Sequence, residues 1–250
     1  MTFSLIAKDP EDGAIGIAVA SRFFASAALV PYVGRSVAVA SQAFVNPVWG
    51  VEGRTRLANG EHAADVLADL IKRDTGEAVR QCHMLDKNGD FACHTGGECV
   101  VWAGHRLGKY HSVAGNMLEG ESVVEAVFST YEESDALPFA ERMLAAMKEG
   151  EAAGGDKRGR QSAGLVIHRG QDYPWLDIRV DDHDDPLAEL DRLLDVAKER
   201  YLYLADFFAT QDVFSRKLAW AGLEETMMEA EAKRLASGWV SRSKATSKEP

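Results

Sequence analysis

The chain opens with Met1-Thr2-Phe3-Ser4-Leu5-Ile6-Ala7, an apolar run that begins with a hydroxyl residue directly after the initiator methionine. Side chains alternate between the two sides of a strand, which puts Phe3 and Leu5 on one side and Ile6 on the other. A strand that is apolar on both faces is normally covered on both faces. We therefore expect this run to be a central strand whose first residue is held rigidly.

A second apolar run follows at residues 14–20. The segment between the two runs is Asp9-Pro10-Glu11-Asp12-Gly13, in which proline presets φ and glycine supplies positive φ. This pattern predicts a β-hairpin. Since residues 15–20 are also apolar on both faces, the hairpin belongs to the interior of the fold.

Thr2 carries a possible nucleophile. If an aminopeptidase removes Met1, as a small second residue favours, Thr2 holds a hydroxyl and a free α-amine on one residue. An α-amine has an ordinary pKa of about 7.7 to 8.0, so part of it is neutral near pH 7 and can accept the hydroxyl proton. Threonine or serine at the second position is also common in proteins without such chemistry, so this residue alone does not identify an enzyme.

Composition limits the classes of function. The 250 residues carry a formal net charge of -11, which argues against a general binder of nucleic acid or anionic membrane. We find no signal peptide and no membrane-spanning run, and expect the protein to stay in the cytoplasm. Cys82, Cys93 and Cys99 are an odd number without a C-x-x-C pair, which indicates reduced thiols.

The remaining pattern predicts an α+β protein. Strands are expected at residues 36–42, 79–86, 90–95, 110–118, 162–168 and 175–180, with helices at 61–73, 121–131, 138–148, 185–209 and 222–236. Residues 46–50 and the Gly-rich residues 152–161 are expected to be loops.

Two histidines are candidates for a metal site. Asn88-Gly89 predicts a two-residue hairpin turn that pairs Lys87 with Asp90 and places His83 opposite His94. Facing imidazoles could begin a zinc site, but no third ligand stands at a recognisable spacing, so a hydrogen-bonded pair is favoured and no metal is predicted.

Several motifs together resemble the bacterial family called domain of unknown function 1028. They are Thr2 to Asp9, Gly16 to Ser21, Ala40-Ser41-Gln42-Ala43, His94-Thr95-Gly96, Trp102 to His105, Ala114-Gly115-Asn116 and Gly154 to Ala163. The resemblance covers roughly residues 2–194. It implies the N-terminal-nucleophile (Ntn) hydrolase fold, a four-layer αββα sandwich, and suggests amide hydrolysis without naming a substrate.

The resemblance and the residue types give a list of site candidates. The catalytic candidates are Thr2 as nucleophile, Asn116 as oxyanion donor, and Ser21 and Arg22 after the second strand; the substrate-binding candidates are Gln42, His94, Asp156, Arg158, Arg160 and Gln161. A positive Arg22 would favour the neutral amine of Thr2, and arginines bind carboxylates in a bidentate manner. The alternatives are a turn role for Asn116, an ordinary strand end for Arg22 and a solvated loop for residues 154–161.

The hypothesis is an Ntn-type amidohydrolase acting on a small, carboxylated or N-acylated metabolite, without a cofactor. We expect the αββα domain at residues 1–185, a helical extension at 186–236 and a disordered tail at 237–250. The competing hypothesis is an inactive binding or assembly protein that kept the fold. In both cases we expect a homo-oligomer, dimer or higher. Under the competing hypothesis the extension could be the oligomerisation element, with an apolar face made of Leu190, Leu193, Leu194 and Ala197.

Overall fold

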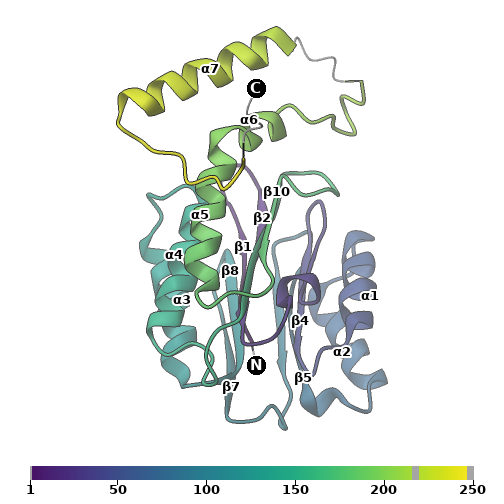
Figure 1. The fold of residues 1–250 in the computed structure, drawn as a ribbon. Coiled ribbons are helices and arrows are strands. Elements are labelled where there is room, and N and C mark those ends of the chain that lie inside the picture. The colour runs from purple at the N-terminus through teal and green to yellow at the C-terminus, as the bar shows by residue number, and fades with distance from the viewer. Residues whose placement is uncertain (1, 216–219, 247–250) are drawn as a thin grey trace. The chain divides into compact units, whose positions relative to one another are not determined.

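Two antiparallel sheets form the centre of the computed structural model, which describes residues 2–215 and 220–246 (Figure 1). The six-stranded sheet has the order β10-β9-β2-β1-β8-β7 and the four-stranded sheet the order β3-β4-β5-β6. The strands are β1 Thr2–Lys8, β2 Ile15–Ser21, β3 Pro31–Val33, β4 Ala38–Ala43, β5 Arg80–Leu85, β6 Phe91–Thr95, β7 Trp102–Leu107, β8 His111–Leu118, β9 Ser162–His168 and β10 Leu176–Val180. The α+β class is confirmed.

Strand β1 lies between β2 and β8, as its two apolar faces predict. Phe3 faces outward against helix α4, Phe139–Ala152, where a side chain at Gly150 would come within 3.1 Å of the Phe3 ring. Ile6 faces the other way, into an apolar cluster that includes Ala40 of β4 and Leu85 of β5. The predicted hairpin of β1 and β2 is also confirmed, with Phe3 paired to Ala20.

Helices cover the outer faces of the two facing sheets (Figure 1). Helix α3, Glu121–Glu133, and helix α4 lie on the six-stranded sheet. Helix α1, Pro47–Ala58, and helix α2, Ala63–Arg73, lie on the four-stranded sheet and bury an apolar cluster that includes Trp49 and Leu70. Short 3₁₀ helices occupy Ser26–Ala28 and Glu77–Val79. The inner faces of the two sheets pack against each other. The candidate site lies at one end of the layer between them.

Several elements differ from the predictions. Residues 46–50 are the start of α1, because the side chain of Asn46 accepts a hydrogen bond from Val48 N at 3.0 Å and Pro47 occupies the first turn. Strands β3 and β7 were not predicted; β3 spans three residues, and β7 has neither a clear alternation nor an apolar run.

The β5–β6 register is offset by one residue from the prediction. His83 pairs with Cys93, and His94 pairs with Cys82, so the two histidines lie on opposite faces of the sheet. The cause is the turn: Asp86 accepts hydrogen bonds from Asn88 N and Asp90 N, which lengthens the connection to residues 86–90. The expected His83–His94 pair is therefore wrong.

The chain divides into two compact units, the first ending at Leu187 and the second beginning at Ala188. The second unit contains most of α5, Pro186–Glu199, together with α6, Tyr201–Ala205, and α7, Trp220–Ala236. The single helix expected at residues 185–209 is thus two helices with a break at Arg200. Within the described part of the chain, no helix has the length and apolar character needed to cross a membrane.

Candidate functional site

A row of polar side chains crosses the six-stranded sheet at the end where β1 begins. Ser162 of β9 pairs with Ser21 of β2, and Thr2 of β1 pairs with Asn116 of β8. Because Phe3 pairs with Ala20, Thr2 comes next to Ser21, so these four residues share one row and one face. All four are buried, and Thr2, the most accessible, is 6% exposed.

The hydroxyl of Thr2 has a close polar neighbour. Thr2 Oγ1 lies 3.2 Å from Ser21 Oγ, and either group can donate the hydrogen bond. Thr2 belongs to the same face as Ile6, so its hydroxyl points into the layer between the sheets. The structure therefore brings together Thr2, Ser21 and Asn116, three of the four catalytic candidates, around the first residue of the central strand.

Asn116 is tied to the strand beside it by its amide hydrogens. Its Nδ2 donates to Gln81 Oε1 at 2.9 Å and to the carbonyl oxygen of Thr2 at 3.3 Å. Its Oδ1 is buried and has no hydrogen-bond partner among the described residues. A buried acceptor without a partner costs about 1 to 3 kcal/mol, which makes this oxygen a point where a ligand donor would be stabilised.

Gln81 connects the two sheets and was missed in the sequence. Its Oε1 also accepts from Gln42 Nε2 at 2.9 Å, and its Nε2 donates to the carbonyl oxygen of Gly115 at 2.8 Å and to Thr95 Oγ1 at 2.9 Å. Gln42, predicted to bind substrate, is 1% exposed and serves this network. The signal in the sequence that could have revealed Gln81 was the presence of polar residues in strands whose other residues predict burial.

His83 ends the same network in the interior. Ser4 Oγ donates to Gln42 Oε1 at 2.6 Å, so at 2.9 Å it accepts the proton of His83 Nε2. His83 Nδ1 then accepts from Ser112 Oγ at 2.7 Å. Burial, with a smaller contribution from His105, lowers the pKa of His83 to about 3, so the ring is neutral and fixed in one tautomer.

The Gly-rich loop folds back on the end of β2. Asp156 Oδ2 accepts from Arg22 N at 2.8 Å, and its Oδ1 accepts from Arg158 N at 2.8 Å. Arg158 Nη2 donates to the carbonyl oxygen of Arg22 at 3.1 Å. Gln161 N donates to the carbonyl oxygen of Ser21 at 3.1 Å. Asp156 is 4% exposed, so its carboxylate fastens the loop to the site.

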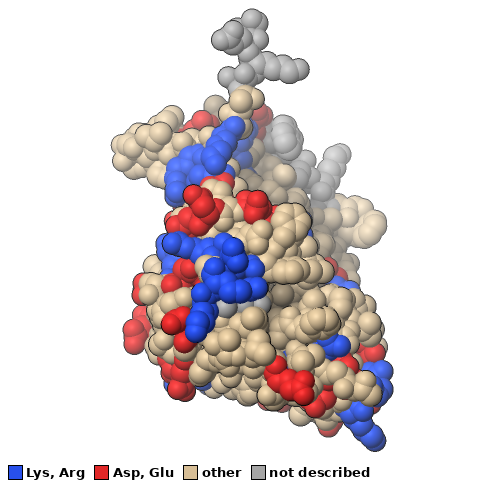
Figure 2. Space-filling model, turned by 60° about the horizontal axis from the view of Figure 1, so that its bottom comes forward, with Lys and Arg blue, Asp and Glu red and all other residues tan. Residues whose placement is uncertain are grey.

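Arginine side chains at this loop differ in their pairing. Arg160 lies 3.3 Å from Glu151 and 3.0 Å from Asp185 in two ion pairs. The guanidinium of Arg22 is exposed and makes no ion pair or hydrogen bond with a described residue. Figure 2, which brings the N-terminal end of the first unit forward, shows a group of basic side chains with acidic ones beside it.

His94 lies away from Thr2. Its ring stacks on Trp49 with centroids 5.9 Å apart, and its Nε2 lies 3.0 Å from the carbonyl oxygen of Glu77. Since His94 pairs with Cys82, whose side chain belongs to the cluster under α1 and α2, it faces those helices. Of the six substrate-binding candidates, His94 is the one that the structure separates from the site.

Cavities adjoin both ends of the polar row. One of about 240 Å³ is lined by Ala43, Phe44, Val79, Glu98, Cys99, Val100, Asn116 and Met117. Another of about 350 Å³ is lined by Arg22, Arg160, Gln161, Asp182, His183 and Asp184. Thr2 stands between them in the sheet, with Asn116 on one side and the Ser21–Arg22 strand end on the other.

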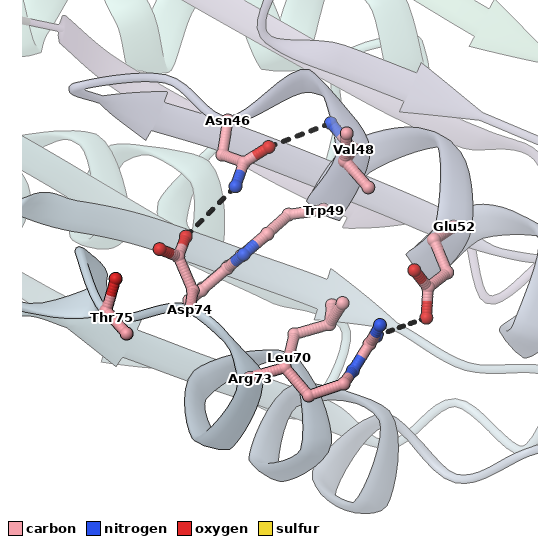
Figure 3. A pocket seen from close by; sticks show the side chains of 8 residues that line it. All are labelled: Asn46, Val48, Trp49, Glu52, Leu70, Arg73, Asp74 and Thr75. Atoms are coloured by element: carbon pink, nitrogen blue, oxygen red, sulfur yellow. Dashed lines mark hydrogen bonds and ion pairs between the residues drawn. The ribbon is translucent and has the colours of Figure 1, made fainter.

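A further cleft of about 280 Å³ lies between α1 and α2 and is lined by Asn46, Val48, Trp49, Glu52, Leu70, Arg73, Asp74 and Thr75 (Figure 3). The charged residues that line it are all paired. Arg73 binds Glu52, and Asn46 Nδ2 donates to Asp74 at 2.9 Å. Asp74 also pairs with Arg80 at 3.1 Å.

The described residues form an α+β protein with two facing antiparallel sheets, and the buried polar row lies at the end of the six-stranded sheet where β1 begins. The family model described as a family of unknown function, DUF1028, matches residues 2–190. The chain therefore belongs to the DUF1028 family. The crystal structure of protein SPO2555 from Silicibacter pomeroyi is similar, with 32% identity and a TM-score of 0.80 over 87% of this chain and 95% of that chain. No curated protein matches.

Proposed function

We propose that this protein is an amidohydrolase of the N-terminal-nucleophile type, with its helices and facing sheets forming the four-layer αββα sandwich of that class. The observation that carries the proposal is the position of Thr2. It is the first residue of the central strand, its Oγ1 lies 3.2 Å from Ser21 Oγ, and cavities adjoin the row on both sides. A fold alone does not establish an activity, so the proposal depends on this geometry.

The reaction would follow removal of Met1. The α-amine of Thr2 accepts the hydroxyl proton while Oγ1 forms a bond to the substrate carbonyl carbon. The tetrahedral intermediate then expels the amine of the substrate. This leaving amine receives the proton from the α-ammonium of Thr2 as the C–N bond breaks. Water, deprotonated by the same α-amine, then releases the acyl group and restores the hydroxyl. No cofactor takes part in these steps.

Oxyanion stabilisation would come from Asn116 Nδ2 or from backbone N–H groups near Thr2. The hydrogen bond from Asn116 Nδ2 to the Thr2 carbonyl oxygen is long, at 3.3 Å, and therefore weak. An oxyanion beside Thr2 would compete with that carbonyl oxygen for the same amide hydrogen. The second hydrogen is held by Gln81 at 2.9 Å, which orients the amide. Losing one such donor costs about a hundred- to a thousandfold in rate.

The leaving group would carry a carboxylate. Arg22 offers a guanidinium without an ion-pair or hydrogen-bond partner among the described residues beside the 350 Å³ cavity, and guanidinium groups bind carboxylates through two parallel hydrogen bonds. Asp156 has a positioning role here, because its oxygens already accept backbone hydrogen bonds from Arg22 and Arg158. This supports a small amino-acid-like amide as substrate.

The test uses Thr2→Ala and Thr2→Ser. Mass spectrometry first measures whether Met1 is removed from each purified protein. Wild-type protein is then screened against N-acyl amino acids, dipeptides, ureido compounds and lactams. We expect Thr2→Ala to lose activity by at least about a thousandfold and Thr2→Ser to retain part of it, because serine keeps the nucleophile. Equal rates for wild type and Thr2→Ala would exclude the mechanism.

The second candidate function is non-enzymatic ligand binding. It is favoured by the small exposure of Thr2, 6%, and by the engagement of both amide hydrogens of Asn116. Retention of Met1 on the purified protein would support this candidate, since an acylated nitrogen is no base. Removal of Met1 together with Thr2-dependent turnover would exclude it.

A further inference from the structure

The 240 Å³ cavity beside Asn116 has an unusual combination of walls. Most lining residues are apolar, and two of them remain open to solvent, Phe44 at 72% and Val100 at 56% exposure. Exposed apolar side chains gathered around a cavity are typical of a binding site. A ligand part that enters this cavity is therefore a compact apolar group.

Two of the lining residues are polar, Asn116 and Glu98. Asn116 Oδ1 is buried without a partner, and Glu98 is exposed and makes no side-chain hydrogen bond or ion pair with a described residue. No lysine or arginine is among the lining residues. Arg80, which contacts the lining residue Phe44, lies over the Phe44 ring and is paired with Asp74. An acceptor and a carboxylate without protein donors fit an ammonium group.

Two residues of the wall have left-handed backbone. Ala43 has φ 67° and Met117 has φ 54°, and neither is glycine. This conformation is strained for a residue with a side chain and persists where the surrounding structure requires it. Both follow residues of the network, Gln42 and Asn116: Ala43 is the last residue of β4, and Met117 lies at the bulge in the β7–β8 pairing, between Asn116 and Leu118.

We infer that this cavity binds the acyl half of the substrate as an apolar α-aminoacyl group, with its ammonium on Asn116 Oδ1 and Glu98. This inference rests on the proposed function, because the bound group is the acyl half of a substrate only if the protein is a hydrolase. It narrows the substrate from N-acyl compounds in general to those whose acyl group carries an amine. With the carboxylate on Arg22, the substrate class is a dipeptide-like amide whose first side chain is apolar. Binding of such a group in the cavity does not require that the protein hydrolyses it.

Binding is measured by calorimetry on the Thr2→Ala protein, which cannot turn over the ligand. The probes are L-leucinamide and 4-methylpentanamide, which is the same molecule without its α-amine. We expect L-leucinamide to bind at least about tenfold more tightly, because its ammonium makes charge-assisted hydrogen bonds that 4-methylpentanamide cannot make. Equal affinities for the two probes would overturn the inference.

Variants identify the cavity. Glu98→Lys reverses an exposed charge, so the fold should be kept while binding of L-leucinamide falls at least about tenfold and binding of 4-methylpentanamide stays within about twofold. The matched control is Glu132→Lys on α3, an exposed glutamate outside the cavity, which should change neither affinity. An unchanged affinity of Glu98→Lys for L-leucinamide would also overturn the inference.

The outcomes separate this inference from the proposed function. If binding depends on the α-amine and on Glu98 but no hydrolysis depends on Thr2, the assignment of the cavity holds and the proposed hydrolase activity is rejected. Thr2-dependent hydrolysis of compounds whose acyl groups lack an amine, at rates equal to those of dipeptides, would keep the enzyme and remove the cavity assignment.

Discussion

The inter-sheet network and the cleft between α1 and α2 are both polar regions beside a cavity of similar volume, about 240 and 280 Å³. The network consists of neutral amides, hydroxyls and one neutral imidazole, nearly all of them deeply buried. The cleft is built from exposed charges such as Arg73, whose side chain is 50% exposed, and Glu52, at 30%. The network leaves Asn116 Oδ1 unpaired, whereas the charged residues of the cleft are all paired, Arg73 with Glu52 (Figure 3) and Asp74 with Arg80 outside the wall.

The difference teaches how to distinguish a candidate site from a polar surface. Exposed ion pairs contribute little stability, about 0 to 1 kcal/mol, and can be rearranged by water. A buried neutral network is costly if any member lacks a partner, so an unpaired atom within it indicates a place for a ligand. Volume alone would have favoured the cleft over the Asn116 cavity.

The largest effect should follow replacement of Gln81 at the centre of the network. Gln81→Leu removes the acceptor of Gln42 and Asn116 and the donor to the Gly115 carbonyl. We expect the free energy of unfolding to fall by about 3 kcal/mol or more, because several buried groups lose their partners. Urea denaturation measures it, and a loss below about 1 kcal/mol would show that the network is not a structural unit.

The second effect concerns pH. His83 has a pKa of about 3 in the folded protein against 6.5 for the ordinary imidazole, so between these values only the unfolded chain binds the proton. The stabilisation is fully present above pH 6.5 and is lost as the pH falls toward 3. From pH 6.5 to 4 we expect His83 to account for a fall of about 3 kcal/mol in the free energy of unfolding.

The matched variant for the pH experiment is His83→Gln, which keeps polar atoms in the network and cannot titrate. Its free energy of unfolding should depend less on pH over the same range, whatever its absolute stability. The same slope in wild type and His83→Gln would mean that His83 is charged in the folded protein, contrary to its burial.

The smallest effect should come from the cleft. Glu52→Gln removes the partner of Arg73, and Arg73 keeps Asp69 at 3.0 Å. We expect a change in the free energy of unfolding of less than about 1 kcal/mol, and no change in L-leucinamide affinity. A loss of ligand affinity in Glu52→Gln would break the comparison, since it would move the binding site to the cleft.

Much of the fold could be predicted from alternation and turn chemistry. The β1–β2 hairpin and the helix at residues 61–73 followed from apolar spacing, and the structure has β1 at Thr2–Lys8 and α2 at Ala63–Arg73. Helix α1 was not predicted, although Asn46-Pro47 carries both an N-cap and a first-turn proline. The β5–β6 register was wrong because the carboxylate of Asp86 lengthens the turn, an effect that the Asn-Gly pair does not reveal.

The sequence by itself determined the α+β class, the central position of the first strand and the choice of Thr2 as the residue to test, because these depend on local alternation and on chemistry within one residue. Only the tertiary structure decided that Asn116 and Ser21 lie beside Thr2, that His94 does not, and that Asn116 Oδ1 lacks a partner. Such neighbours come from strands far apart in the chain, and whether a buried atom is satisfied depends on every strand that packs around it.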